Sequence, residues 1–247
     1  MNARTRDEVE GLKAAGVAVR SAFDAMVANA QAGMTTRDLD NIGAEVLAKH
    51  GARSAPQLYY DFPGATCISV NEEAAHGIPG ERVLQDGDMI NIDVSANRDG
   101  FVADMGQSFV LGEGTDEQAR ICKSVREAVE SALKKIKSGR PLNIIGETVQ
   151  KVADREGYTI VKNLGSHGVG RNIHEEPSYV PFDNPEETRT LERGLVLTIE
   201  PFFCTGTDWV YEEADGWTLS VPKGELVAQF EHTLIVTDNG PVVVTGP

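Results

Sequence analysis

An internal repeat is the feature that most constrains how this 247-residue chain can fold. Glycines and apolar residues that mark two consecutive helices recur at an offset of 106 residues. The matched pairs are Gly33 and Gly139, Val19 and Val125, Leu39 and Ile145, Val46 and Val152, and Gly51 and Gly157. At an offset of 107, residues 87–93 match residues 194–200. Unless amphipathic helices agree here by coincidence, the chain holds two copies of one unit, about 1–112 and 113–247, related by a pseudo-twofold axis.

Each copy is predicted to contain two helices followed by antiparallel strands. Apolar residues at helical spacing indicate helices at 7–29, about 36–51, 117–137 and 144–155. Short β-branched runs separated by Gly and Asp turns indicate antiparallel sheet within residues 66–111. Because no linker divides the halves, we expect an α+β fold in a single domain over 1–247, with the duplicated helix–helix–sheet units sharing one antiparallel sheet.

The charge of the chain excludes several classes of partner. Lys and Arg number 23 against 38 Asp and Glu, and the net charge of −15 would repel nucleic acids and anionic membranes. No run approaches the roughly 18 apolar residues of a membrane span, and the first residues lack the apolar core of a signal peptide. Cys67, Cys122 and Cys204 are widely spaced, which is typical of reduced thiols. We therefore expect a cytoplasmic enzyme.

Four carboxylates lie inside apolar, strand-like runs: Asp93, Asp104, Glu200 and Glu231. The first two are 11 residues apart, with the turn signal Asp99-Gly100 between them. We expect each to end a strand of one hairpin, with both carboxylates on the same face. A solvated turn is the ordinary alternative for any one of these acids.

Four buried carboxylates require compensation. Two like charges about 4 Å apart cost about 4 kcal/mol at an effective dielectric constant near 20. Such acids must be protonated, paired with Lys or Arg, or bound to cations. Basic residues are sparse around Glu200 and Glu231, so two divalent ions bridged by shared acids are the economical solution.

Three of the five histidines lie in Gly- and Pro-rich segments that lead into strands: His76, His167 and His174. A single histidine is more often a surface or hydrogen-bonded core residue, and we assign that ordinary role to His50 and His232. Three in similar contexts favour a functional site.

Taken together, these motifs resemble the methionine aminopeptidases. The resemblance rests on an ordered set: His-Gly-Ile-Pro at 76–79, Asn-Ile-Asp at 91–93 followed 11 residues later by Asp, Gly-x-His-Gly-x-Gly-Arg-x-x-His-Glu-Glu-Pro at 165–177, Thr-Ile-Glu-Pro at 198–201 and Gln-Phe-Glu-His-Thr at 229–233. It covers nearly the whole chain and implies the duplicated pita-bread (creatinase/aminopeptidase) fold. Only 31 residues separate Glu200 from Glu231, which resembles the minimal bacterial-type, type 1 enzymes.

The resemblance implies a dinuclear centre that binds two divalent ions per chain (Co, Mn, Fe(II), Zn or Ni). Its ligands would be Asp93, Asp104, His167, Glu200 and Glu231. Asp104 and Glu231 would bridge the ions, and Glu200 would also act as general base.

The resemblance also implies the residues that contact the substrate. His76 and His174 would be catalytic histidines at the scissile amide. The methionine pocket would be lined by Tyr59, Phe62, Cys67, Ile173 and Trp217, although core packing is the ordinary alternative for Phe62 and Trp217. Pro56 and Ile173 depart from the pattern of many bacterial members, which concerns substrate preference and leaves the metal ligands intact.

The implied reaction is metal-dependent hydrolytic removal of the N-terminal methionine from nascent proteins and peptides whose second residue is small and uncharged. The expected protein is a cytoplasmic monomer that meets its substrates at the ribosome exit. Three alternatives are a prolidase or proline-specific aminopeptidase, a non-catalytic binding member of the fold, and a metal-storage protein. The prolidases carry a large extra N-terminal domain, whereas 75 residues precede His76 here, and all five ligands and both histidines are present.

Overall fold

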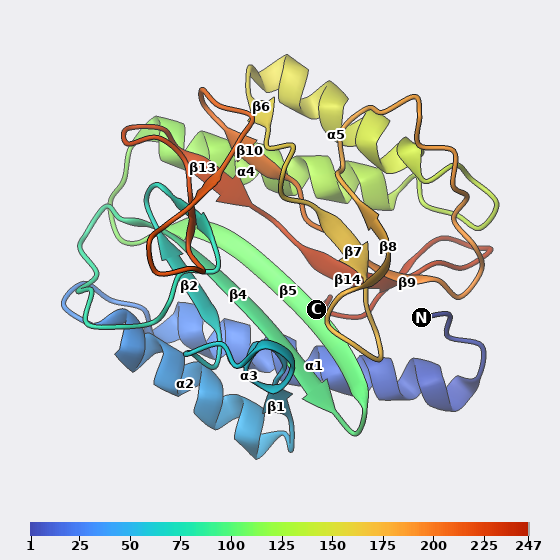
Figure 1. Ribbon diagram of the computed structural model, residues 1–247, viewed down its shortest axis with the longest axis horizontal. Coiled ribbons are helices and arrows are strands. Elements are labelled where there is room, and N and C mark those ends of the chain that lie inside the picture. The colour runs from blue at the N-terminus through green and yellow to red at the C-terminus, as the bar shows by residue number, and fades with distance from the viewer. Residues whose placement is uncertain (247) are drawn as a thin grey trace.

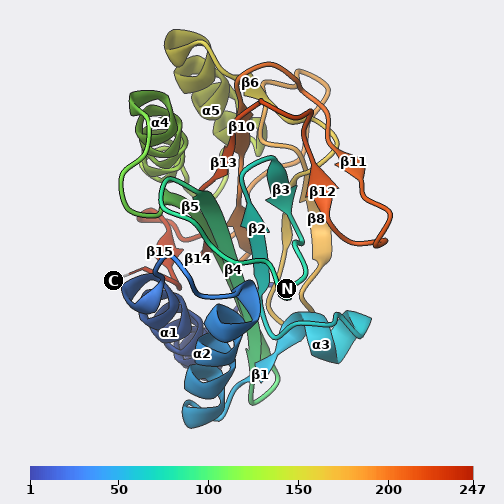
Figure 2. The ribbon, with the colours of Figure 1, turned by 90° about the vertical axis from the view of Figure 1, so that its left-hand side faces the viewer.

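The computed structural model describes residues 1–246, and its long helices cover one face of antiparallel sheets. These helices are α1 (Arg6–Asn29), α2 (Thr36–Lys49), α4 (Asp116–Leu133) and α5 (Asn143–Glu156). They lie on the left in Figure 2, whereas the short helix α3 (Ala55–Tyr60) and the strands β11 (Tyr211–Glu212) and β12 (Leu219–Ser220) lie on the right. One face of the sheets is therefore closed by helices, and the other is bordered by short elements.

Side-chain caps fix where most of the long helices begin. Thr5, Thr35 and Thr115 each accept a hydrogen bond from the backbone N–H three residues later, and the residue at that position returns a bond to the cap. The helix α5 begins at Asn143, and the residue before it, Leu142, makes no such bond. Its start depends instead on packing, because Leu142 is buried in the core.

The helix α4 is shorter than predicted. It ends at Leu133 because Lys135 and Ile136 bond back to the carbonyl of Ala132 and the chain turns. Ile136 nevertheless stays buried in the core. The turn thus preserves the apolar stripe that predicted a helix as far as residue 137.

The centre of the molecule is a long hairpin of β4 (Met89–Arg98) and β5 (Phe101–Val110), seen in green in Figure 1. Asp99 and Gly100 form its turn with φ of 53° and 80°, as the turn signal predicts. All ten residues of each strand pair, so Asp93 and Asp104 lie within the strands. The expectation that each acid ends a strand is wrong, because the ladder continues to the turn.

The remaining strands are short, and all of them pair antiparallel. They are β1 (Arg53–Ser54), β2 (Cys67–Val70), β3 (Glu73–Ala75), β6 (Thr159–Ile160), β7 (Ser166–Gly168), β8 (Glu175–Tyr179), β9 (Val196–Ile199), β10 (Phe202–Cys204), β13 (Val227–Gln229), β14 (His232–Ile235) and β15 (Val242–Val243). The first half forms the ladder β1-β4-β2 with β5 beside β4, and the second half contains the ladder β15-β14-β9-β7-β8.

Hydrogen bonds join the two halves at the edge of β5. The N–H of Glu231 donates to the carbonyl of Gly106 (2.8 Å). The Thr233 hydroxyl donates to the carbonyl of Asp104 (2.8 Å) and accepts from the Asp104 N–H (2.9 Å). The strands around Asp104 and Glu231 therefore meet in the centre of the molecule. Within residues 1–246, no helix is long and apolar enough to cross a membrane.

Candidate active site

A cavity of about 350 Å³ lies beside the short helix α3, whose residues Pro56 and Tyr60 form part of its wall. Ten of the twelve predicted site residues line it: Phe62, Cys67, His76, Asp93, Asp104, His167, Ile173, His174, Glu200 and Trp217. Pro56 also lies in its wall. Residues that are far apart in the sequence thus meet around one space, with the carboxylates and histidines from both halves.

The central hairpin places Asp93 and Asp104 on one face. Asp93 pairs with Gly106, and Asp104 pairs with Ser95, so the two acids are diagonal neighbours across the ladder. Burial, together with the charge of nearby Glu200, raises the pKa of Asp93 to about 7. The hairpin therefore holds two carboxylates close together at a site that disfavours negative charge.

The second half brings His167 and Glu231 to Asp104. Ligand atoms of these three buried residues all lie within 4.8 Å of one another. Nδ1 of His167 lies 2.9 Å from the carbonyl oxygen of Gly168, which can only accept, so Nδ1 donates. Nε2 faces the carboxylates, 3.2 Å from Glu200 and 3.8 Å from Asp104. An imidazole held by a carbonyl in this way presents Nε2 as a ligand.

Neighbouring side chains orient the acids of the second half. Thr198 accepts from the N–H of His167 (3.0 Å) and donates to Oε1 of Glu200 (2.7 Å). The Gln229 amide donates to Glu231 (3.2 Å). A Cβ at Gly106 would lie 2.3 Å from Oε1 of Gln229, so the missing side chain at Gly106 makes room for this amide. Sequence reasoning missed Gln229, although it lies within the motif at 229–233.

The chemistry of this cluster fits divalent cations. Oδ1 of Asp104 and Oε1 of Glu231 are buried and have no hydrogen-bond partner within the described residues. Burial and the adjacent negative charges hold the pKa of both acids well above the usual range. The lining of the cavity, which falls entirely within residues 56–217, contains no Lys or Arg. Orphaned oxygens beside an imidazole are a donor set suited to hard or borderline divalent ions.

The other two histidines flank this cluster. His76 follows β3 with φ of 56°, a conformation that is uncommon outside glycine and is found at functional sites. A Cβ at Gly77 would lie 2.2 Å from the carbonyl of Ile68, so the chain behind His76 requires glycine. Burial lowers the pKa of His76. Partial burial and the neighbouring His167, whose ring centroid lies 4.3 Å away, lower the pKa of His174 to about 4.

The apolar end of the cavity contains the residues expected to bind methionine. Phe62 and Trp217 meet edge to face, with ring centroids 5.1 Å apart. Cys67 and Ile173 are buried beside them. Burial and the charge of Asp93 raise the pKa of Cys67, which keeps the thiol neutral. This part of the cavity suits a thioether or aliphatic side chain.

Tyr59 does not line the cavity. Its hydroxyl donates to the carbonyl of Arg171 (2.9 Å) and accepts from the Asn97 amide (2.9 Å). The adjacent Tyr60 lines the cavity in its place. Sequence reasoning missed both Tyr60 and the helix α3 that carries it, although Ser54 followed by Pro56 is a helix-start signal.

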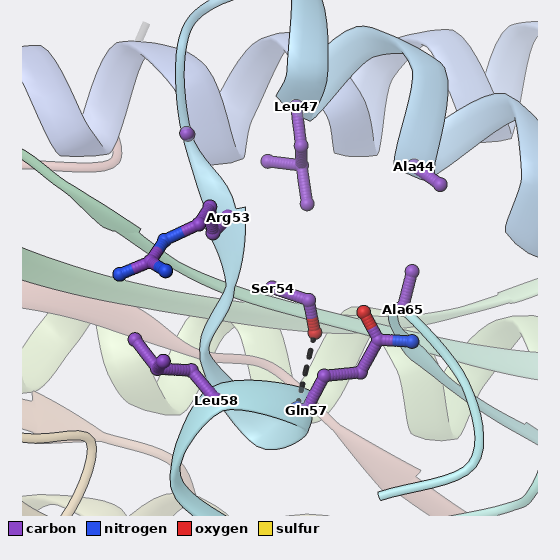
Figure 3. A pocket seen from close by; sticks show the side chains of 8 residues that line it. Ala44, Leu47, Arg53, Ser54, Gln57, Leu58 and Ala65 are labelled. Atoms are coloured by element: carbon purple, nitrogen blue, oxygen red, sulfur yellow. Dashed lines mark hydrogen bonds between the residues drawn. The ribbon is translucent and has the colours of Figure 1, made fainter. Parts of the chain in front are cut away.

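The helix α3 also borders a second cavity, of about 370 Å³. In Figure 3, Gln57 and Leu58 reach toward the second cavity from α3, and Leu47 reaches toward it from α2. All residues lining the second cavity fall within 44–65, and none of the carboxylates or histidines of the site is among them. Some side chains of α3 therefore line the first cavity, and others line the second.

A carboxylate at the first residue of β8 ties the preceding loop to the start of the chain. Oε1 of Glu175 accepts from the N–H groups of Arg171 (2.7 Å) and Asn172 (2.8 Å). Oε2 pairs with the ammonium group of Met1. These bonds fix the loop immediately before the position of His174.

A helix-covered antiparallel sheet, with buried carboxylates and a histidine beside a substrate-sized cavity, is the architecture of a metal-dependent hydrolase. Residues 10–238 match the model of "Metallopeptidase family M24". Methionine aminopeptidase 2 of Bacillus subtilis is 44% identical over 96% of this chain and 96% of its own length. The methionine aminopeptidase of Escherichia coli is 35% identical, over 98% of this chain and 92% of its own.

Solved structures agree with the sequence relatives. The crystal structure of methionine aminopeptidase from Thermotoga maritima superimposes with a TM-score of 0.96, at 32% identity, over the full length of both chains. The chain therefore belongs to metallopeptidase family M24 and, within it, to the methionine aminopeptidases. The predicted family, its pita-bread fold and its class as a hydrolase are confirmed.

Proposed function

We propose that the protein removes the N-terminal methionine, with divalent metal ions, from peptides and nascent proteins whose second residue is small and uncharged. The carrying observation is the buried group of Asp104, His167 and Glu231, which lies beside an apolar cavity with Phe62 and Trp217 in its wall. A metal cluster alone would suit many hydrolases. Its position beside a pocket for a thioether side chain favours methionine.

The proposed ligands are Asp93, Asp104, His167, Glu200 and Glu231. Bound divalent ions would supply Lewis acidity toward the scissile carbonyl and the attacking water. The unpartnered oxygens of Asp104 and Glu231 support the assignment of these two acids as ligands.

Glu200 is the proposed general base. Thr198 bonds to its Oε1 (2.7 Å), and Ser166 accepts from its backbone N–H (3.0 Å). These bonds orient a carboxylate that faces the cavity and can accept a proton from water, then return it to the leaving amine.

His76 and His174 are proposed to bind the scissile amide. Their lowered pKa values keep both imidazoles neutral near pH 7, so each ring has one N–H to donate and one nitrogen to accept. A donor placed at the carbonyl oxygen stabilises the charge that develops there by roughly 3–4 kcal/mol.

The preference for a small second residue rests on the resemblance and on the size of the cavity. A space of about 350 Å³ must hold the methionine side chain and the reacting amide together. A bulky or charged second side chain would be buried without partners, which costs affinity.

Release of methionine from a Met-Ala-Ser peptide tests the proposal. We expect release that stops with EDTA and returns with Mn²⁺, Co²⁺ or Zn²⁺, while Met-Glu-Ser and Ala-Pro peptides stay intact. Asp104→Asn is the matched control, because it keeps the shape of the side chain and removes its charge. Cleavage of Ala-Pro in preference to Met-Ala-Ser would support a proline-specific enzyme, and EDTA-resistant release would contradict the metal requirement.

We also infer that the protein acts as a monomer in the cytoplasm, on chains at the ribosome exit. The net charge of −15 supports an encounter with the emerging peptide without tight binding to RNA. Sedimentation of the purified protein checks the monomer, and co-sedimentation with ribosomes over a salt series checks the encounter.

A further inference from the structure

Tyr60 makes a hydrogen bond to His174 that the proposed reaction does not yet explain. Oη of Tyr60 lies 2.7 Å from Nδ1 of His174, and the two ring centroids are 5.5 Å apart. Both residues border the cavity, but they come from α3 and from the loop before β8. The bond therefore connects two segments 114 residues apart in the wall of the cavity.

The length of this bond indicates its direction. Hydrogen bonds donated by a hydroxyl cluster near 2.7–2.8 Å, whereas those donated by a nitrogen cluster near 2.9–3.0 Å. A separation of 2.7 Å therefore favours donation by the Tyr60 hydroxyl to Nδ1. In a neutral imidazole, a nitrogen that accepts carries no hydrogen, so the hydrogen resides on Nε2.

We propose that Tyr60 is a positioning residue that fixes His174 as the tautomer with its hydrogen on Nε2. This inference rests on the proposed function, in which His174 donates to the scissile carbonyl. The opposite tautomer would present Nε2 as an acceptor, and an acceptor cannot bond to a carbonyl oxygen. Tyr60 thus determines which hydrogen bond His174 offers without itself touching the reacting atoms.

The surrounding structure holds Tyr60 in place for this role. The Ser54 hydroxyl accepts from the N–H of Gln57 (3.3 Å) and caps α3, as the dashed line in Figure 3 shows. At the other end, Asp61 adopts a left-handed conformation with φ of 56° and bonds back to the carbonyl of Pro56. Hydrogen bonds therefore cap the short helix α3 at both ends, and Tyr60 is its last residue.

The test compares Tyr60→Phe with Tyr211→Phe. Each substitution removes one hydroxyl from a tyrosine of similar exposure (45% and 46%), and the Tyr211 hydroxyl bonds to the carbonyl of Val221, away from the cavity. Long-range ¹H–¹⁵N spectra of the zinc-loaded protein, labelled with ¹⁵N-histidine, report the tautomer of each ring directly. A His174→Gln sample assigns the His174 signals.

We expect His174 to show the Nε2–H tautomer in the wild type and in Tyr211→Phe, and a mixture of tautomers in Tyr60→Phe. With Met-Ala-Ser, kcat of Tyr60→Phe should fall about tenfold, as for the loss of one hydrogen bond, with KM little changed. An Nδ1–H tautomer in the wild type, or a wild-type spectrum and kcat in Tyr60→Phe, would overturn the proposal. If the wild type released no methionine, the proposed function would fail, whereas the spectra would still decide the hydrogen bond.

Discussion

The two halves of the molecule present their site residues in different ways. The first half supplies Asp93 and Asp104 from one hairpin, in which every residue of both ten-residue strands is paired. The second half supplies His167, Glu200 and Glu231 from separate segments, on or beside strands of three or four residues. Continuous backbone pairing positions the acids of the first half, and the Thr233 hydroxyl adds two bonds at the backbone of Asp104. In the second half, short strands need help from side chains.

That help comes from a few polar residues beside the ligands. Thr198 connects His167 to Glu200, and Gln229 holds Glu231. Ser95 lies opposite Asp104 in the hairpin, and within residues 1–246 its side chain makes no hydrogen bond to a proposed ligand. The two sides of one site thus depend on different kinds of bond. Substitution of neutral polar residues should therefore affect one half more than the other.

The largest effect should come from two of the proposed ligands, one from each half. Asp104→Asn and Glu231→Gln should each lower kcat/KM by about 10³-fold or more, because residues that act as a unit fail together. Each should also weaken the binding of both ions, measured by calorimetric titration. Two unchanged metal affinities in either variant would contradict the ligand assignment. They would also show that the two halves contribute unequally to metal binding.

A smaller loss is expected from His76→Asn. Asparagine tolerates a positive φ, so the variant should keep the backbone at residue 76 while removing the imidazole. We expect kcat/KM to fall about 10²-fold with the metal content unchanged, measured by elemental analysis alongside kinetics. Loss of metal would instead identify His76 as a ligand.

The comparison is sharpest for Thr198→Val against Ser95→Ala. The first removes the bonds to His167 and Glu200 at nearly constant volume, and should weaken metal binding about 10- to 100-fold. The second changes the opposite wall of the cavity and should alter metal affinity by less than about threefold. Equal effects would show that the hairpin also depends on its side chains.

Removal of the ions should make stability depend on pH. The folded-state pKa of Asp93 is raised from 3.8 to about 7, so the neutral acid favours the folded state below pH 3.8. That stability is lost as the pH rises from about 4 to about 7. Each unit of difference between the folded and unfolded pKa corresponds to about 1.4 kcal/mol. The Tm of EDTA-treated protein should therefore be lower at pH 7.5 than at pH 5. Ion-loaded protein should not show this fall, and an identical pH dependence in both forms would contradict the cluster as the cause.

The smallest effect concerns the helix caps, of which each half has its own. Thr35→Ala and Thr115→Ala each remove a helix cap, one per half, and should lower the free energy of unfolding by about 1 kcal/mol. Urea titration measures this change, and metal affinity should stay the same. A loss of metal binding in either variant would mean that the helical layer also controls the site.

Local patterns in the sequence predicted the features that local interactions determine. Apolar spacing and capping residues located the four long helices, and Asp99-Gly100 located the hairpin turn. The motifs singled out most residues of the cavity because the chemistry of the site requires particular side chains at fixed spacing. The end of α4 was predicted wrongly because a turn after Leu133 ends the helix. The extents of β4 and β5 were predicted wrongly because their pairing continues past Asp93 and Asp104 to the hairpin turn.

Other features depend on contacts that no local pattern records. Tyr59 and Tyr60 are adjacent, and only the path of α3 decides which of them faces the cavity. The Gln229 amide donates a hydrogen bond to Glu231 and accepts one from Asn91, which lies 138 residues away in the sequence. Its role becomes visible only when both halves are in place.

The hydrogen bonds between the two halves also determine at which stage of synthesis the active site can form. Asp104 is bonded to Thr233 across 129 residues, and Glu231 bonds to Gly106 in the same region. During synthesis, the hairpin with both of its acids would leave the ribosome long before Glu231 exists. Because larger chains fold as their parts emerge, the hairpin must wait with one edge unpaired until the strands around Glu231 and Thr233 arrive. A protein whose proposed substrates are unfinished chains would thus acquire its own active site only after the strands around Glu231 have emerged.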